Sequence, residues 1–305
     1  VFILYTENIE ILWPITLRTN GEAGSVILQP NEWNIPTVTI LTDNAQSPSR
    51  FIGIKFAEAW SERAVVVEGE TKAEFNNCVF SNNLVGIDAA EKSVVIIDNS
   101  KFTGNYEACA QARGTATLEI RNSSLYGAEQ SHMIKTPFGQ RVTVIIENCS
   151  FYGLLYQGDD RGIGVYIGPL GNVVIRNSYF EELDSAIETH QAESVLIENN
   201  RIDKCNGGIW IWNLPDSRTD AQILKNVITH CSSGICLAGH TASLLITENR
   251  IMYCGHGINV QIPACGGSEA PFDGVIQGTG NVLRSITTKL CPPINSPFWP
   301  EGFFK

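Results

Sequence analysis

Five residues between positions 135 and 190 carry side chains that could perform acid–base chemistry on a polysaccharide. Lys135, Tyr166 and His190 are of the types that remove a proton beside a uronate carboxylate in a β-elimination. Glu188 and Asp160 could act as the acid and base of a glycoside hydrolysis. The candidate catalytic residues are therefore Lys135, Glu188, His190 and Asp160, and both reaction types stay open as hypotheses.

Aromatic and polar residues near these positions are suited to holding a sugar chain. Flat rings supply apolar contact with the faces of pyranose rings, and polar groups set the orientation of the sugar. The candidate substrate-binding residues are Tyr166, Trp210, Trp212, Arg161, Asn259 and Gln261. The alternative is that Trp210 and Trp212 pack beneath residues 213–220 and stay covered.

These residues can act together only if strands bring them together, and an internal repeat supplies such strands. Each unit alternates apolar and polar residues, passes through an Asn-containing turn and ends in a large apolar residue. The eight terminal residues are Phe80, Phe102, Leu125, Phe151, Phe180, Ile202, Ile228 and Ile251, in steps of 22 to 29 residues. Units of this length hold two or three short β-strands and no helix of ordinary length.

The repeat predicts an all-β fold, a single-stranded parallel β-helix or solenoid of about eleven coils. Strands this short must pair, in parallel, with the equivalent strand one unit away. Neighbouring coils should lie about 4.8 Å apart, which gives a rod roughly 50 Å long.

The second strand of each unit should present one face to solvent, because side chains alternate along a strand. With its isoleucines, such as Ile87 and Ile187, pointing inward, one group of residues should point outward together. This group consists of Asp88, Met133, Lys135, Tyr166, Glu188, His190, Trp210, Trp212, Cys236, Asn259 and Gln261.

Stacking also predicts columns of identical residues. One column should be an amide ladder that satisfies buried turn groups; it holds Asn77, Asn99, Asn122, Asn148, Asn177 and Asn199. A second column, Cys205, Cys231 and Cys254, is expected to consist of buried free thiols. Cys265 and Cys291 are the pair for which we expect a disulfide.

We expect one β-helix domain over residues 1–305, with irregular first coils at 1–63, regular coils at 64–262, and a last coil with a cap at 263–305. The hydrophobic content of 43% excludes disorder, and the formal net charge of −11 argues against a nucleic-acid or anionic-membrane partner. No stretch is long enough for a membrane span.

No metal site or cofactor is expected, although calcium stays open because of a group of acids. These acids are Asp159, Asp160, Glu181, Glu182 and Asp184.

The repeats resemble those of pectin-lyase-like proteins, the right-handed parallel β-helix repeat proteins of the carbohydrate-binding and sugar-hydrolase type. Residues 5–9 (YTENI) and 15–18 (ITLR) are similar to that family's first coil, and the resemblance covers about residues 1–290. It implies a right-handed coil, in agreement with the general crossover rule. Because such proteins begin with a capping helix, it also implies that further chain precedes Val1.

From these observations we expect an extracellular polysaccharide-binding β-helix, located in the secreted, periplasmic or cell-surface fraction. Cleavage by lyase or hydrolase chemistry in a groove along one sheet stays open. The alternative is a non-catalytic structural or adhesive surface protein, for which membership of a larger assembly with a protein partner stays open.

Overall fold

The computed structural model describes residues 2–127, 132–137, 141–153, 162–214, 219–261, 271–287 and 291–305. These residues form β-strands and turns and contain no helix. Within the same ranges, therefore, no helix has the length and apolarity needed to cross a membrane.

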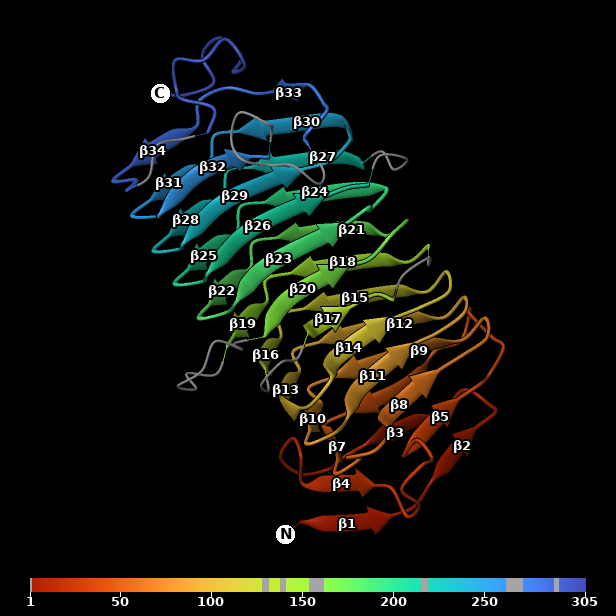
Figure 1. Ribbon diagram of the computed structural model, residues 1–305. Coiled ribbons are helices and arrows are strands. Elements are labelled where there is room, and N and C mark those ends of the chain that lie inside the picture. The colour runs from red at the N-terminus through yellow and green to blue at the C-terminus, as the bar shows by residue number, and fades with distance from the viewer. Residues whose placement is uncertain are drawn as a thin grey trace.

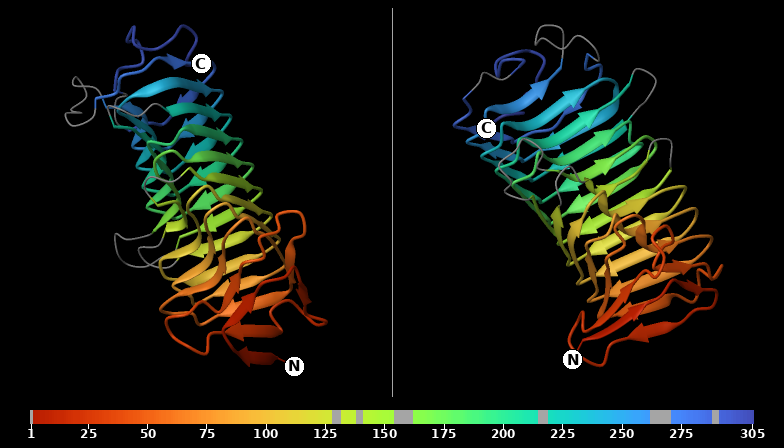
Figure 2. Two further views of the ribbon diagram at one scale, coloured as in Figure 1. Left: turned by 90° about the vertical axis from the view of Figure 1, so that its right-hand side faces the viewer. Right: turned by 60° about the horizontal axis from the view of Figure 1, so that its bottom comes forward.

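The chain winds through three parallel sheets, and every strand pairs with the strand three positions away in chain order. Figures 1 and 2 show the coils stacked in sequence order from the N-terminus to the C-terminus. With eleven strands in two of the sheets among the described residues, the predicted number of about eleven coils is confirmed.

Sheet A contains twelve strands in this order: β1 (Ile3–Thr6), β4 (Val26–Gln29), β7 (Ile54–Ala57), β10 (Val79–Ser81), β13 (Lys101–Asn105), β16 (Ser124–Gly127), β19 (Ser150–Tyr152), β22 (Tyr179–Glu181), β25 (Arg201–Asp203), β28 (Val227–Thr229), β31 (Arg250–Met252) and β34 (Val282–Arg284). Sheet B contains eleven: β2 (Ile9–Ile11), β5 (Val38–Ile40), β8 (Arg63–Val67), β11 (Val85–Ala89), β14 (Ala108–Ala112), β17 (His132–Lys135), β20 (Ile163–Ile167), β23 (Ser185–His190), β26 (Gly207–Trp212), β29 (Ser233–Ala238) and β32 (His256–Val260). Sheet C contains eleven: β3 (Thr16–Arg18), β6 (Ser49–Ile52), β9 (Lys72–Asn76), β12 (Val94–Asp98), β15 (Thr117–Arg121), β18 (Thr143–Glu147), β21 (Asn172–Arg176), β24 (Ser194–Glu198), β27 (Thr219–Leu224), β30 (Thr241–Thr247) and β33 (Ile276–Gln277).

The core follows the axis of the coil and is built from the repeated apolar residues. Phe80 pairs with Phe102 across neighbouring strands of sheet A, and their stacked rings lie 4.6 Å apart, centroid to centroid. Phe151 and Phe180 stack in the same way at 4.5 Å. All four side chains are fully buried, so the repeat that defines the coils also fills their interior.

Strands of sheet B such as β11 and β17 begin with an outward-facing residue that is followed by two successive inward-facing residues, which corrects one prediction. A Cβ on Gly86 would contact the Phe102 ring in the core and lie 2.4 Å from the carbonyl oxygen of Cys109 in the next coil. At the same position in β17, Met133 is fully buried, although alternation predicts that it points outward. Residue pairing skips this position, so the neighbouring His132 takes the outward place.

The predicted asparagine column stacks, but its side chains are exposed. Asn77, Asn99 and the equivalent residues adopt a left-handed turn conformation with φ near +50°, which turns their side chains toward solvent. Asn148 donates to Asn122 at 3.4 Å. The prediction that this column satisfies buried groups is therefore wrong.

The buried ladder lies one residue later in the coil. Asn200 donates through Nδ2 to Oδ1 of Asn226 at 3.0 Å, Asn226 donates likewise to Asn249 at 3.0 Å, and Asn249 to Asn281 at 3.1 Å. All four residues are at most 1% exposed. The same amides also bind backbone groups of adjacent coils, so they connect the turns of four coils.

The cysteine column is present as expected. Cys205, Cys231 and Cys254 are buried and free. Hydrogen bonding to Cys205, together with burial, raises the pKa of Cys231 to about 12, so the thiol stays protonated at neutral pH. Cys291 is disulfide-bonded; its predicted partner, Cys265, lies outside the described residues.

Asn226→Ala should lower the free energy of unfolding by about 2–4 kcal/mol, because it leaves buried donors of Asn200 and the carbonyl of Ile197 without partners. Lys225→Ala is the matched control: it changes the adjacent exposed residue of the same turn and should stay within about 0.5 kcal/mol of wild type. Urea unfolding measures both variants. Equal denaturation midpoints for the two variants would contradict a structural role for the ladder.

Candidate functional site

The outward face of sheet B carries the predicted site residues in one column. Lys135 pairs with Tyr166, Tyr166 with Glu188, and Glu188 with Trp210, each on the next strand. Trp210 pairs with Cys236 and that residue with Asn259, so the column continues to β32. His190 and Trp212 pair with each other two residues farther along β23 and β26.

Four rings cross this face in contact with one another. The centroids of His132 and Tyr166 lie 5.1 Å apart, those of Tyr166 and His190 5.0 Å, and those of His190 and Trp212 5.1 Å. All four side chains are half-buried, and so is Trp210. We call His132, Lys135, Tyr166, Glu188, His190, Trp210 and Trp212 the sheet B strip.

Trp210 lies over the backbone of its own strand. A Cβ on Gly207 would come within 2.5 Å of the Trp210 Nε1 atom and 2.7 Å of the Ser185 hydroxyl oxygen. The absence of a side chain at Gly207 therefore leaves room for the Nε1 edge of the Trp210 indole. Trp210 and Trp212 thus remain partly accessible at this face rather than fully covered.

Glu188 is held as a carboxylate by its neighbours. Burial alone would raise its pKa, but hydrogen bonds from His190 and Ser185, and the nearby imidazole charges, bring the pKa below its usual value. Its Oε2 atom lies 3.5 Å from Nε2 of His190. Glu188 can therefore accept hydrogen bonds at neutral pH, whereas a general acid of a glycosidase needs a raised pKa.

The other polar groups of the strip differ in their partners, and among the described residues the buried Nε1 atom of Trp210 has no hydrogen-bond partner. Lys135 forms an ion pair with Glu107, at the turn that precedes β14. Burial and the neighbouring Glu188 raise the pKa of Tyr166, so its phenol stays protonated at neutral pH. The strip thus offers a cation, a phenol and a carboxylate in fixed places.

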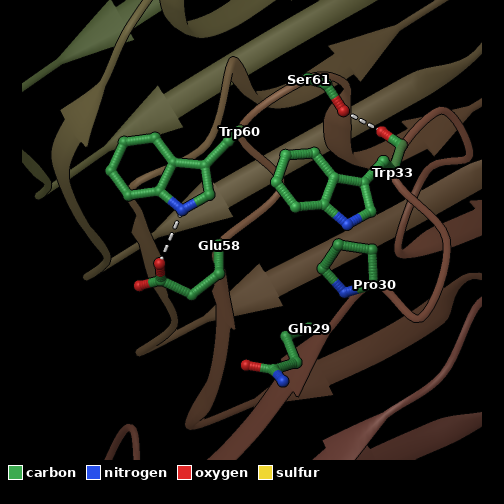
Figure 3. Close-up of a pocket in the computed structure, with 6 residues that line it drawn as sticks. All are labelled: Gln29, Pro30, Trp33, Glu58, Trp60 and Ser61. Carbon is green, nitrogen blue, oxygen red and sulfur yellow. Dashed lines mark hydrogen bonds between the residues drawn. The ribbon is translucent and has the colours of Figure 1, made fainter.

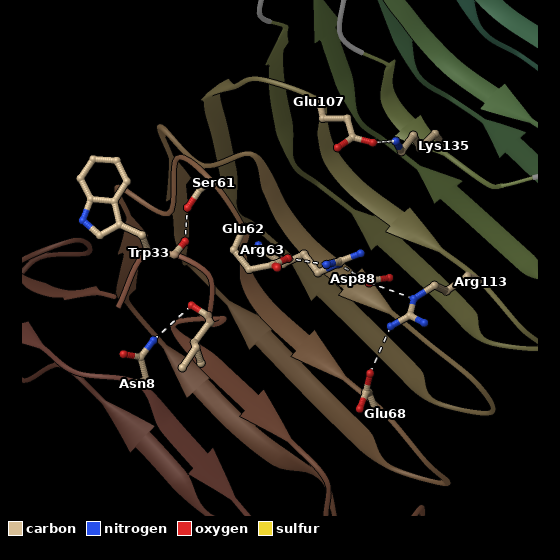
Figure 4. Close-up of polar contacts among 11 residues, drawn as sticks. Asn8, Trp33, Ser61, Glu62, Arg63, Glu68, Asp88, Glu107, Arg113 and Lys135 are labelled. Atoms are coloured by element: carbon tan, nitrogen blue, oxygen red, sulfur yellow. Dashed lines mark hydrogen bonds and ion pairs between the residues drawn. The ribbon is translucent and has the colours of Figure 1, made fainter. Parts of the chain in front are cut away.

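Toward the N-terminus the same column contains a structural ion-pair cluster. Asp88 is fully buried, and its Oδ2 atom accepts hydrogen bonds from Nε of Arg63 at 2.9 Å and Nε of Arg113 at 3.0 Å. The two arginines also pair with Glu62 and Glu68. Figure 4 shows this cluster and the Glu107–Lys135 pair on neighbouring strands of one face.

Four further residues predicted for the site, Asp160, Arg161, Asn259 and Gln261, are not among the residues of the strip. Asp160 and Arg161 lie outside the described residues. Asn259 and Gln261 are half-buried at the C-terminal end of sheet B, where the Gln261 amide contacts Cys236 at 4.0 Å. They lie two coils beyond Trp210 and do not belong to the ring contacts.

Sequence reasoning missed His132, Glu107 and Ser185. Strict alternation predicts that Met133 faces outward, so it does not predict an outward-facing His132. Glu107 lies in a turn and Ser185 at the start of a strand, and the repeat pattern marks neither position as a site residue. In the part of the chain that the structure describes, no cluster of three or more His, Cys, Asp or Glu side chains is arranged to hold a metal. Of the acids considered for calcium, Glu181 and Glu182 contact Lys204, and Asp159 and Asp160 lie outside the described residues.

The stability of the fold should depend on pH through His132. Burial, followed by the Lys135 charge, lowers the pKa of His132, so the unfolded chain binds a proton first when the pH falls. The melting temperature should therefore fall as the pH drops from 7 through 6.5, the ordinary value, toward the lowered folded pKa. His132→Phe should reduce this decline in thermal melts recorded across that range.

His256→Phe is the matched control, because His256 occupies the same register position five coils away. It should leave the pH dependence close to that of wild type. Identical pH profiles for His132→Phe and wild type would contradict the assignment.

Comparisons with known proteins agree with this architecture. The family model described as "right handed beta helix region" matches residues 39–152 and 137–261. No curated protein sequence gives a significant match. One similar solved structure is PfbA, a surface adhesin of Streptococcus pneumoniae, with 14% identity over 91% of this chain and 84% of that chain and a TM-score of 0.47.

Another is the catalytic domain of a GH87 alpha-1,3-glucanase in complex with nigerose, with 11% identity and a TM-score of 0.39. That match covers all of this chain but 63% of the glucanase chain, so the present chain spans less than two thirds of its length. The family match extends over more than half of the chain and agrees with the three parallel sheets. The chain therefore belongs to the right-handed β-helix family.

Proposed function

We propose that the sheet B strip binds an uncharged polysaccharide. The observation that carries this proposal is the contiguous set of His132, Tyr166, His190 and Trp212 rings, with centroid separations of 5.0–5.1 Å, on four neighbouring strands. Partly exposed flat rings suit the apolar faces of sugars, and the Glu188 carboxylate suits their hydroxyl groups.

The electrostatics favour binding over cleavage. Glu188 has a lowered pKa and so fits an acceptor better than a general acid. Asp88, in the same column, lies four coils away, or about 19 Å, whereas paired carboxylates of glycosidases lie about 5–9.5 Å apart. Asp160, the partner predicted from sequence, is outside the described residues. We therefore propose recognition as the role of the strip and treat turnover as an outcome to be measured.

Two further properties fit a role outside the cell on a neutral polymer. The net charge of −11 disfavours strongly anionic substrates, because the summed negative field repels them. The disulfide at Cys291 favours an oxidising compartment. We infer a secreted or surface-attached protein.

Trp212→Ala should weaken binding to soluble uncharged polysaccharides by at least about tenfold, because a large ring contact at the end of the strip is lost. Trp13→Ala is the matched control: Trp13 is 79% exposed at the N-terminal end, away from the strip, and its loss should leave affinity unchanged. Affinity electrophoresis on a panel of neutral and uronic-acid polymers measures both variants. Equal retardation of Trp212→Ala and wild type on every polymer would overturn the proposal.

Turnover on the same panel separates a binder from an enzyme. Glu188→Gln should weaken retention, and neither it nor wild type should release reducing or unsaturated ends. Wild-type turnover that is lost in Glu188→Gln at an unchanged melting temperature would instead assign catalysis to the strip. Absence of glycan binding together with self-association at micromolar concentration would favour the adhesive alternative.

A further inference from the structure

A second aromatic site lies outside the strip, at the turns that lead from sheet A into sheet B. Trp33 follows β4 and Trp60 follows β7, and both belong to a surface pocket of about 210 Å³ (Figure 3). Gln29, Pro30, Glu58 and Ser61 complete the lining. The two indoles are 78% and 53% exposed, so most of their surface is open to solvent.

The groups that form this pocket are held in place. The Trp60 Nε1 atom donates to Glu58 Oε2 at 2.8 Å, and Asn82 Nδ2 donates to Glu58 Oε1 at 2.9 Å. The Ser61 hydroxyl donates to the carbonyl of Trp33 and connects the two turns, as Figure 3 shows. Anchoring of this kind reduces the ordering cost of binding a ligand.

We propose that this Trp33–Trp60 pocket binds a sugar ring of the same uncharged polysaccharide that the sheet B strip recognises. The inference rests on the proposed function and extends it to a second subsite. The indole faces supply stacking surface, while the carboxylate of Glu58 and the amide of Gln29 supply partners for hydroxyl groups.

The chemistry of the pocket favours a sugar over a quaternary ammonium ion. A cation would be recognised over the ring faces, whereas the Glu58 charge lies at the edge of the Trp60 indole, where it accepts the N–H bond. A methylated ammonium group carries no N–H or hydroxyl group, so the polar side chains of the pocket could not form hydrogen bonds with it. Both features instead match a ligand with an apolar face and hydroxyl edges.

The location of the pocket connects it to the strip. Ser61 directly precedes Glu62 and Arg63, whose ion pairs extend to Asp88 and Arg113. Figure 4 shows Trp33 and Ser61 at a turn beside this ion-pair cluster, with the Glu107–Lys135 pair farther along the sheet. The strands β8 and β17 are three coils apart, or about 14 Å. Along the coil axis, this spacing is short enough for one polymer chain to extend from the coil of the pocket to the first coil of the strip.

Binding of polymers and short oligosaccharides tests the inference. The probes are a soluble uncharged hexose polymer retained by wild type and its di- and trisaccharides, measured by titration calorimetry. The double variant Trp33→Ala/Trp60→Ala should bind the polymer about tenfold more weakly, while the strip's affinity for the short sugars stays unchanged. Trp210→Ala/Trp212→Ala should weaken both. Trp13→Ala serves as the control for loss of an exposed indole, and thermal melts confirm folding.

The outcomes separate the two proposals. Wild-type polymer affinity in Trp33→Ala/Trp60→Ala overturns the second subsite and leaves the strip intact. Loss of polymer binding in that variant, with wild-type affinity in Trp210→Ala/Trp212→Ala, supports the pocket as a sugar site and overturns the strip. Quenching of wild-type tryptophan fluorescence by choline but not by sugars, absent in Trp33→Ala/Trp60→Ala, would overturn the assigned ligand class.

Discussion

Parallel hydrogen bonding between coils is the constraint on which the rest of this structure depends. Each strand has its partner one coil away, so the position of every side chain on the surface follows from its place in the repeat. Phenylalanine rings, asparagine amides and cysteine thiols therefore each stack on the same type of residue in the neighbouring coil. The buried ladder from Asn200 to Asn281 shows why such stacking is stable, because each amide satisfies the backbone and side chain of its neighbour.

The same constraint produces two kinds of surface. Sheet faces carry side chains at fixed spacing, and the contacting rings of the sheet B strip are a consequence of that spacing. The turns between sheets vary in length, so they can present groups that no column requires. Trp33 and Trp60 occupy such turns. A polymer that lies along the rod can use both kinds of surface, which is the arrangement proposed here for an uncharged glycan.

The electrostatics of this face support the proposal of recognition over cleavage. Buried Asp88 is neutralised by two arginines, and Lys135 is paired with Glu107. The pKa of Glu188 lies below its usual value because His190 and Ser185 stabilise the charged form. A site with paired ions and an ionised acceptor suits hydrogen bonding to hydroxyl groups, whereas glycoside hydrolysis requires a protonated acid close to a second carboxylate.

The sequence alone determined the coil, because a repeat of 22 to 29 residues is long enough for short strands and can bury its apolar residues only by stacking. It also placed Lys135, Tyr166, Glu188 and Trp210 in one outward column, since register follows from the repeat. Only the tertiary structure decided which residue of each pair faces inward. The strand pairing skips Met133, which lies in the core while His132 faces outward. The asparagines at the left-handed turn positions are exposed, so the buried amide ladder lies one residue later. Contacts between separate turns, as at Trp33 and Trp60, likewise depend on loop paths that no periodicity encodes.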